Sequence, residues 1–277
     1  MIKSITAVVN PDNRDIAQML TEDEGGLGIK PKDVEAVIWS HSHFDHVGDP
    51  STFPTTTDLV VGPGVKAASW PGWPSNPEGK VLDADAEGRV VREVRFGDED
   101  GQGGLMIGRF RAMDYFGDGS FYLLDAPGHA VGHMCGLARV TPSSAAGGSS
   151  FVFMGADGCH HAGVLRPTEY LPLPGTVGSC PGALLQQLHP HGSAVRPFFS
   201  VSPQLFPDHE TALETVRKME EIDASEDILV VIAHDLSLRG QIDFYPKDIN
   251  GWKKTAVRDK TRWLFCRDFE GGIEGNG

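Results

Sequence analysis

The chain has 277 residues, 40% hydrophobic and 22% charged, which is typical of a globular protein with a full core. Its 24 basic and 38 acidic side chains give a formal net charge of −14, which argues against binding to a nucleic-acid backbone. The N-terminal apolar run is too short for a secretory signal or a membrane span, and four scattered cysteines predict no disulfide framework. We therefore predict a single domain over residues 1–277, in a reducing, cytoplasmic setting, with no membrane partner.

The expected elements are mostly short strands, with helices between them. Residues 12–24 have the apolar spacing of a surface helix, and residues 208–222 predict a longer helix with Asp208 as its N-cap. Asp118 lies between two glycines before an aromatic-rich segment, which favours a hairpin. Short apolar runs bounded by Gly, Pro or Asp predict strands at 36–39, 59–61, 90–96, 121–124, 134–140, 151–155 and 228–233.

Several of these strands end in a histidine or an aspartate. The first delivers the segment SHSHFDHVGD, residues 40–49, and later strands lead to His129, Asp157 and His234. Strand ends are rigid, so they can hold ligands at the short distances that zinc requires. A polar loop of solvated histidines is the simpler alternative for any one of these segments. Together they predict a metal site where four strand ends meet at one edge.

The pattern resembles the metallo-β-lactamase superfamily, whose signature HxHxDH is present as His41-Ser42-His43-Phe44-Asp45-His46. The later PGH turn, the aspartate at the end of a strand and the last histidine occur in the family's order. The resemblance implies an α+β fold, a four-layer αββα sandwich. It also implies two metal ions, the first bound by His41, His43 and His129, the second by Asp45, His46 and His234, with Asp157 bridging both.

Histidine and carboxylate ligands without thiolate suit Zn²⁺ best, with iron, manganese or cobalt as alternatives. Two such cations would supply hydroxide from water and polarise a carbonyl group, while Asp45 accepts or relays a proton. The expected reaction is hydrolysis of an ester, lactone, thioester or amide-type bond. A covalent serine mechanism receives no support, because the chain has no GxSxG.

Within the superfamily, the lactone-hydrolysing branch is most similar, and residues 158–167 resemble fungal members for which opening of a lactone, lactam or cyclic carbamate is expected. One position departs from the branch. Bacterial signalling-lactone hydrolases have a tyrosine three residues after the bridging aspartate, where this chain has His160. We expect His160 to act as a hydrogen-bond donor or acid, or else to form part of the pocket wall. His161 is a weaker candidate.

Other polar residues near the motifs are expected to have supporting roles. We expect His133 to orient a neighbouring group or to pack against it. Asp49 and Asp235 should cap a backbone turn or hold a metal ligand in place. Aromatic side chains in three segments are expected to form pocket walls or else ordinary loop packing, and three histidines are expected at the surface. The candidate walls are 69–73, Tyr170 with Leu171, and Phe198 with Phe199, and the surface histidines are His189, His191 and His209.

The first predicted strand reaches its motif after only 40 residues, so the family's N-terminal strands are expected to be shortened or absent. A sheet edge exposed in this way could support a homo-oligomer. Two alternatives to a lactonase-like hydrolase of small molecules therefore remain open. They are a thioesterase acting on carrier-bound or coenzyme-bound acyl chains, and an inactive, truncated paralogue.

Overall fold

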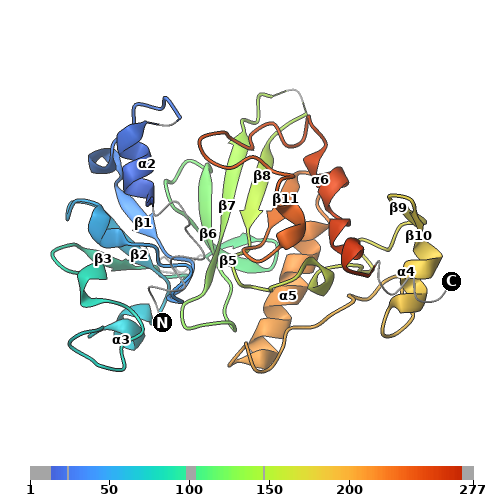
Figure 1. The fold of residues 1–277 in the computed structure, drawn as a ribbon, viewed down its shortest axis with the longest axis horizontal. Helices are drawn as coiled ribbons and strands as arrows, with labels where there is room; N and C mark the ends of the chain where they lie inside the picture. The colour runs from blue at the N-terminus through green and yellow to red at the C-terminus, as the bar shows by residue number, and fades with distance from the viewer. Residues whose placement is uncertain (1–13, 24, 98–103, 146, 270–277) are drawn as a thin grey trace. The chain divides into compact units, whose positions relative to one another are not determined.

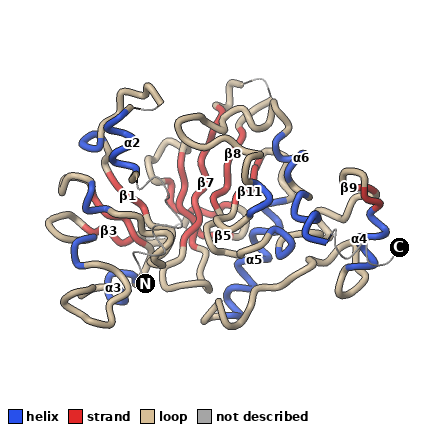
Figure 2. The backbone as a smooth tube through the Cα atoms, in the orientation of Figure 1, coloured by secondary structure: helices blue, strands red, loops and turns tan. Residues whose placement is uncertain are grey.

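A computed structural model describes residues 14–23, 25–97, 104–145 and 147–269 (Figure 1). The chain divides into two compact units, Met1–Val94 with Tyr245–Lys247, and Arg95–Phe244 with Asp248–Gly277. Each unit has its own sheet, which Figure 2 distinguishes from the helices. The expectation of one domain over 1–277 stays a prediction.

The first unit contains a parallel sheet of three strands in the order β1-β2-β3. Every β2 residue except Asp58 is buried, because β2 lies between its two neighbours. A helix precedes this sheet, and a second follows its central strand. The elements are α2 (Ile16–Glu22), β1 (Ala36–Ile38), β2 (Asp58–Val61), α3 (Val65–Ser69) and β3 (Val91–Glu93).

The core of the first unit forms around Trp39, the residue that follows β1. Its ring stacks on Trp70 with a centroid distance of 5.7 Å, and both rings pack with Leu59, Val61 and Val65. Such a large buried aromatic side chain fixes the end of β1 firmly. The chain therefore leaves this core at a defined point, directly before the histidine-rich loop.

The second unit contains a sheet of six strands in the order β11-β8-β7-β6-β5-β4. Only the β11–β8 pair is parallel, so β6, β8 and β11 all run in the same direction. The strands are β4 (Leu105–Ile107), β5 (Phe110–Asp114), β6 (Phe121–Asp125), β7 (Met134–Thr141), β8 (Ser150–Met154) and β11 (Ile228–Val231).

Helix α5 (His209–Asp223) covers one face of this sheet (Figure 1). Its buried residues recur at helical spacing, and its N-cap Asp208 accepts a hydrogen bond from the Thr211 amide. Side chains alternate along the strands, so Phe153 packs toward α5 while its neighbour Val152 joins a separate cluster with Trp252. The remaining elements are β9 (Thr176–Val177), β10 (Cys180–Pro181), α4 (Gly182–Leu188) and α6 (Val257–Thr261).

A buried ion pair joins the C-terminal end of α5 to the loop after β8. The Arg166 guanidinium donates two hydrogen bonds of 2.6 Å to the Asp223 carboxylate and a third to the Arg262 carbonyl. Arg262 in turn donates to the Asp223 carbonyl. Burying a charged group is costly unless an opposite charge and hydrogen bonds compensate it. Here the compensating groups come from three segments of the chain.

The structure confirms the predicted strands and both helices, with shifted ends. The first helix begins at Ile16 with Asp15 as its N-cap, and the strand expected at 90–96 extends only over Val91–Glu93. Residues 12, 13 and 24 of the expected first helix lie outside the described residues. The hairpin around Asp118 joins the antiparallel strands β5 and β6. No helix within the described ranges has the length and apolar character needed to cross a bilayer.

Candidate metal centre

The loop after β1 is held by a side-chain hydrogen bond that joins its two ends and by a backbone turn inside it. The Trp39 indole nitrogen donates to the Val47 carbonyl at 2.8 Å, so the buried tryptophan holds the far end of the loop. Inside the loop, the His46 amide donates to the His43 carbonyl at 3.0 Å and forms a turn. The close spacing of HxHxDH and this turn place the histidine rings of the motif beside one another.

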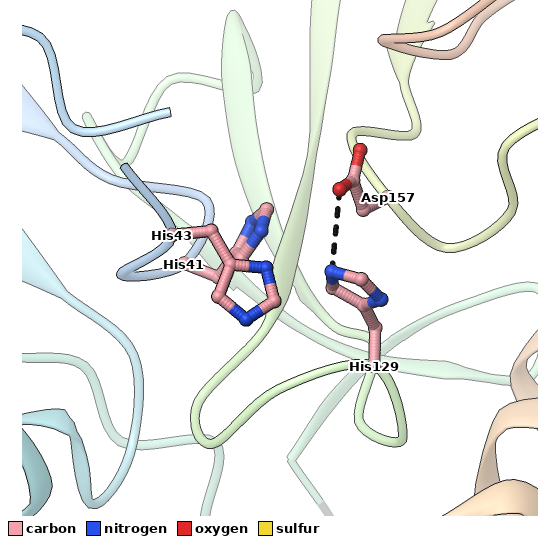
Figure 3. A group of neighbouring side chains, drawn as sticks. All are labelled: His41, His43, His129 and Asp157. Carbon is pink, nitrogen blue, oxygen red and sulfur yellow. Dashed lines mark ion pairs between the residues drawn. The ribbon is translucent and has the colours of Figure 1, made fainter. Parts of the chain in front are cut away.

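The three histidines of this loop form one cluster within the first unit. The His41 ring centroid lies 4.5 Å from that of His43 and 4.2 Å from that of His46 (Figure 3 shows His41 and His43). The Ser40 hydroxyl lies 3.1 Å from His41 Nδ1, which leaves Nε2 as the nitrogen for a metal. Asp45 and His46 are 3.6 Å apart between Oδ2 and Nε2.

In the second unit, sheet register brings the remaining predicted ligands to one edge. Met154 pairs with Val231 in the parallel β8–β11 ladder, and Asp157 and His234 each follow three residues later. His129 follows β6, which runs in the same direction, so all three ligands lie beyond the C-terminal ends of their strands. Strand β1 belongs to the sheet of the first unit, so the expectation of four strand ends at one edge stays a prediction for that strand.

The Asp157 carboxylate is the centre of this second group. Oδ2 lies 3.2 Å from Nε2 of His129 and 3.2 Å from Nε2 of His160, while Oδ1 lies 3.1 Å from Nε2 of His234. Figure 3 marks the His129–Asp157 pair. Only 2% of Asp157 is exposed, so three imidazoles surround a carboxylate that is almost fully withdrawn from water.

His133 holds two of these ligand-bearing segments together. Its Nδ1 lies 2.7 Å from the Ala126 carbonyl and must donate, so Nε2 accepts the Asp157 amide at 3.1 Å. The ring is completely buried. This confirms the expectation that His133 orients its neighbours. The residue before Asp157, Ala156, has φ of +42°, a strained conformation of the kind that is common at functional sites.

Helix α5 supports the PGH turn that carries His129. Thr215 Oγ1 donates to the Pro127 carbonyl at 2.7 Å, and the turn approaches the helix closely at Gly128. Gly128 has φ of +123°, and a Cβ there would lie 2.4 Å from the Ala212 amide nitrogen. Only glycine permits both the conformation and the approach.

His160 lies among the ligands, whereas His161 has a structural role. The His160 ring centroid is 5.1 Å from those of His129 and His234. His161 accepts the Gly163 amide through Nδ1, and its Nε2 lies 2.9 Å from Asp268. These two interactions give His161 a structural role, and a catalytic role is not needed to account for its position.

Sequence reasoning missed Phe206, whose buried ring lies 5.0 Å from that of His129 and 5.3 Å from that of His160. The sequence signal that could have indicated this position is its place directly before Pro207 and Asp208, where helix α5 begins.

Two carboxylates near the motifs have the capping role that was predicted, whereas one histidine predicted at the surface is buried. Asp49 and Asp235 accept the Ser51 and Ser237 amides and cap short 3-10 helices, as expected. His189 was expected at the surface, but it is buried and its Nε2 lies 2.7 Å from the Arg196 carbonyl. A loop that folds back over the ring encloses it.

The donor set of each unit fits a divalent transition metal. One oxygen or nitrogen atom from each of Asp157, His160 and His234 lies within 4.8 Å of the others, so the three could hold a common ion. Imidazole and carboxylate donors are those of catalytic zinc sites. The first unit offers the same donor types in His41, His43, Asp45 and His46.

Comparison with known proteins gives the same assignment. The family model described as the metallo-beta-lactamase superfamily matches residues 11–140. A protein of Annulohypoxylon moriforme named metallo-hydrolase mfmC is 60% identical over 273 residues, which are 95% of this chain and 69% of that protein. The chain belongs to the metallo-β-lactamase superfamily. Its two larger sheets and their helices are those of the metallo-β-lactamase fold.

Two further relatives are considerably longer than this chain. The protein of Penicillium brevicompactum named cytochrome P450 monooxygenase mpaDE' is 54% identical over 99% of the chain, which spans only 30% of that protein. A protein of Fusarium pseudograminearum named gamma-lactamase FDB1 is 44% identical over 92% of the chain and 62% of its own length. The chain therefore spans less than two thirds of both proteins.

Proposed function

We propose that this chain is a metal-dependent hydrolase that opens a small cyclic ester or a related lactam or cyclic carbamate. The observation that carries the proposal is the Asp157 carboxylate, which three imidazole nitrogens approach within 3.2 Å in a buried position. Membership of the superfamily supports the same reading, as do relatives named metallo-hydrolase and gamma-lactamase. The proposed partner is a small molecule, with no nucleic acid.

The proposed centre holds two metal ions, with zinc as the best match to its ligands. His41, His43 and His129 would bind one ion, and Asp45, His46 and His234 the other, with Asp157 shared. When bound, such a pair lowers the pKa of water toward neutrality and polarises a carbonyl group. The donor types present in the chain support this assignment, since all seven positions hold histidine or aspartate.

The side chains of this chain would orient the ligands and move the proton. His133 fixes the backbone of Asp157 and the segment before His129. Asp45 is the proposed proton acceptor, because its carboxylate is 27% exposed and can exchange a proton with water. The His160 imidazole is the proposed hydrogen-bond donor to the substrate carbonyl.

Metal analysis and a substrate panel test the proposal. The purified chain should contain about two zinc ions and should hydrolyse at least one of a five-membered lactone, lactam, cyclic carbamate or acyl thioester. Asp157→Asn and His43→Ala should each lower metal content and reduce kcat/KM about 100-fold or more. His209→Gln is the control, because this ring lies 3.1 Å from the Val201 carbonyl through Nε2 and is not among the proposed metal ligands. Fewer than one metal per chain, with activity unaffected by Asp157→Asn, would reject the proposal.

The role of His160 can be separated from that of a metal ligand. His160→Phe keeps a ring beside Phe206 but removes both nitrogens. If His160 donates to the substrate, the variant retains its metal and loses kcat. If His160 holds a metal instead, the variant loses zinc together with activity. Preference for thioesters in the panel would favour the thioesterase alternative.

A further inference from the structure

A cavity of about 380 Å³ lies in the second unit between α5 and the segments after β8. Its volume falls at the lower end of the range for small-molecule pockets, about 300–1,000 Å³. The floor is apolar and includes the buried side chains of Val164, Val201 and Val216, with Leu213 beside them. None of these residues belongs to the proposed metal centre.

The rim of this cavity carries two arginine side chains and a histidine. Arg196 and His191 approach from the loop after α4, and Arg217 approaches from α5. The two arginine charges stand out in a protein with a net charge of −14. Opposite charge attracts a ligand most strongly where the surrounding surface is apolar and excludes water.

A buried histidine holds the loop that carries this rim. His189 Nε2 lies 2.7 Å from the Arg196 carbonyl and 3.0 Å from the Pro197 carbonyl. Its Nδ1 accepts the amides of His191 and Ser193. The rim is therefore positioned before any ligand arrives, which lowers the entropic cost of binding.

Both arginine side chains can receive a ligand carboxylate. Within the part of the chain that the structure describes, the Arg196 guanidinium has no hydrogen bond or ion pair. Among the described residues, Arg217 has one ion pair, a solvent-exposed pair with Glu214 at 3.4 Å, which is weak at that distance. Guanidinium groups bind carboxylates with two parallel hydrogen bonds, so this rim is suited to a carboxylate anion.

One acidic residue, Glu220, also lines the cavity. Burial raises the pKa of its carboxyl to about 7, with further increases from Glu221, Asp223 and Glu169 and an opposing effect of Arg217. Near neutral pH a large fraction of this carboxyl is therefore protonated. In that form it can donate a hydrogen bond to an anion and does not repel it.

We infer that this cavity binds an amphipathic carboxylic acid, whose carboxylate pairs with Arg196 and Arg217 and whose apolar part packs on Val164 and Val216. The inference is independent of the proposed hydrolase function, since no metal ligand takes part. A ligand of this class satisfies both halves of the site. A purely apolar molecule would leave the guanidinium groups unused, and a cation would be repelled.

Octanoate is a suitable probe, with octan-1-ol and octylamine as neutral and cationic analogues of the same length. Titration calorimetry of the full chain should detect saturable octanoate binding in the submillimolar range, with much weaker binding of the two analogues. Arg196→Gln and Arg217→Gln should each weaken octanoate binding about tenfold or more. Arg111→Gln, an exposed arginine on β5, is the matched control and should bind as the wild type does.

Leu213→Gln tests the apolar floor separately and should also weaken octanoate binding, with the unfolding temperature measured alongside. Three results would overturn the inference. The first is no saturable octanoate binding, and the second is equal binding of octylamine. The third is undiminished octanoate binding in both arginine variants at an unchanged unfolding temperature.

Discussion

Replacing His133 tests how the structure holds the ligand-bearing segments in place. In His133→Leu the Ala126 carbonyl and the Asp157 amide lose partners at 2.7 Å and 3.1 Å, in a position with no solvent exposure. A buried backbone group left without a partner costs about 1–3 kcal/mol, so two such groups cost about 2–6 kcal/mol. We expect the free energy of unfolding to fall by that amount.

Two polar variants separate the contributions of the two ring nitrogens. His133→Asn can retain a donor near the Nδ1 position, while His133→Gln can retain an acceptor near Nε2. Each should lose about half as much stability as His133→Leu. Urea unfolding of the metal-free chain gives the free energies. Zinc titration of the same proteins should show affinity reduced about 10- to 100-fold, most in the variants that release the Asp157 amide.

If His133→Leu had the same urea midpoint of unfolding as the wild type, the reasoning would be refuted, because neither hydrogen bond would then contribute to stability. Equal stability of the Asn, Gln and Leu variants would also contradict it. In that case the ring would act through packing alone. A stable variant with unchanged zinc affinity would show that the Asp157 backbone needs no support from His133.

Three further substitutions have defined outcomes. Gly128→Ala should cost about 3 kcal/mol or more in urea unfolding, because its Cβ would overlap Ala212 and its φ of +123° is strained; wild-type stability would contradict this. Asp223→Ala should lose about 3–5 kcal/mol by leaving the buried Arg166 guanidinium uncompensated, and combining it with Arg166→Met should recover most of that loss. Glu220→Gln should change the pH dependence of the melting temperature. Burial raises the pKa of this carboxyl from 4.5 to about 7, so its stabilising contribution is complete below 4.5 and is lost as pH rises through 7. The melting temperature of the variant, relative to wild type, should rise from pH 5 to pH 8, and a constant difference would exclude the burial argument.

Much of the site could be predicted from sequence because its ligands are carried by local patterns. HxHxDH concentrates four donors in six positions, and short apolar runs before His129, Asp157 and His234 mark strand ends. The parallel register of β8 and β11 then confirms that Asp157 and His234 share one edge. Alternating apolar residues, together with the glycines that bound the strands, are enough to predict where these strands end.

The interactions that hold the ligands could not be read in the same way, because they join segments far apart in the sequence. Nothing local indicates that His133 receives the Asp157 amide, 24 residues later, or that Phe206 lies against His129. The burial of His189 was missed for the same reason, since its partners come from a loop that returns over it. Pairing of β1 with β2 rather than with the second sheet also depends on tertiary packing.

Helix α5 shows why such packing matters for the proposed chemistry. Thr215 and Ala212 contact the turn before His129, and a Cβ on Gly158 would lie 2.5 Å from the Met219 sulfur, so the chain around Asp157 rests on the same helix. One turn further on, Asp223 binds Arg166 from the loop that follows His160. The buried stripe of α5 therefore supports two segments of the site, the turn before His129 and the chain that carries Asp157 and His160, as well as forming a core. A shift of this helix would disturb the supports of His129, Asp157 and His160 together, in addition to those that His133 supplies.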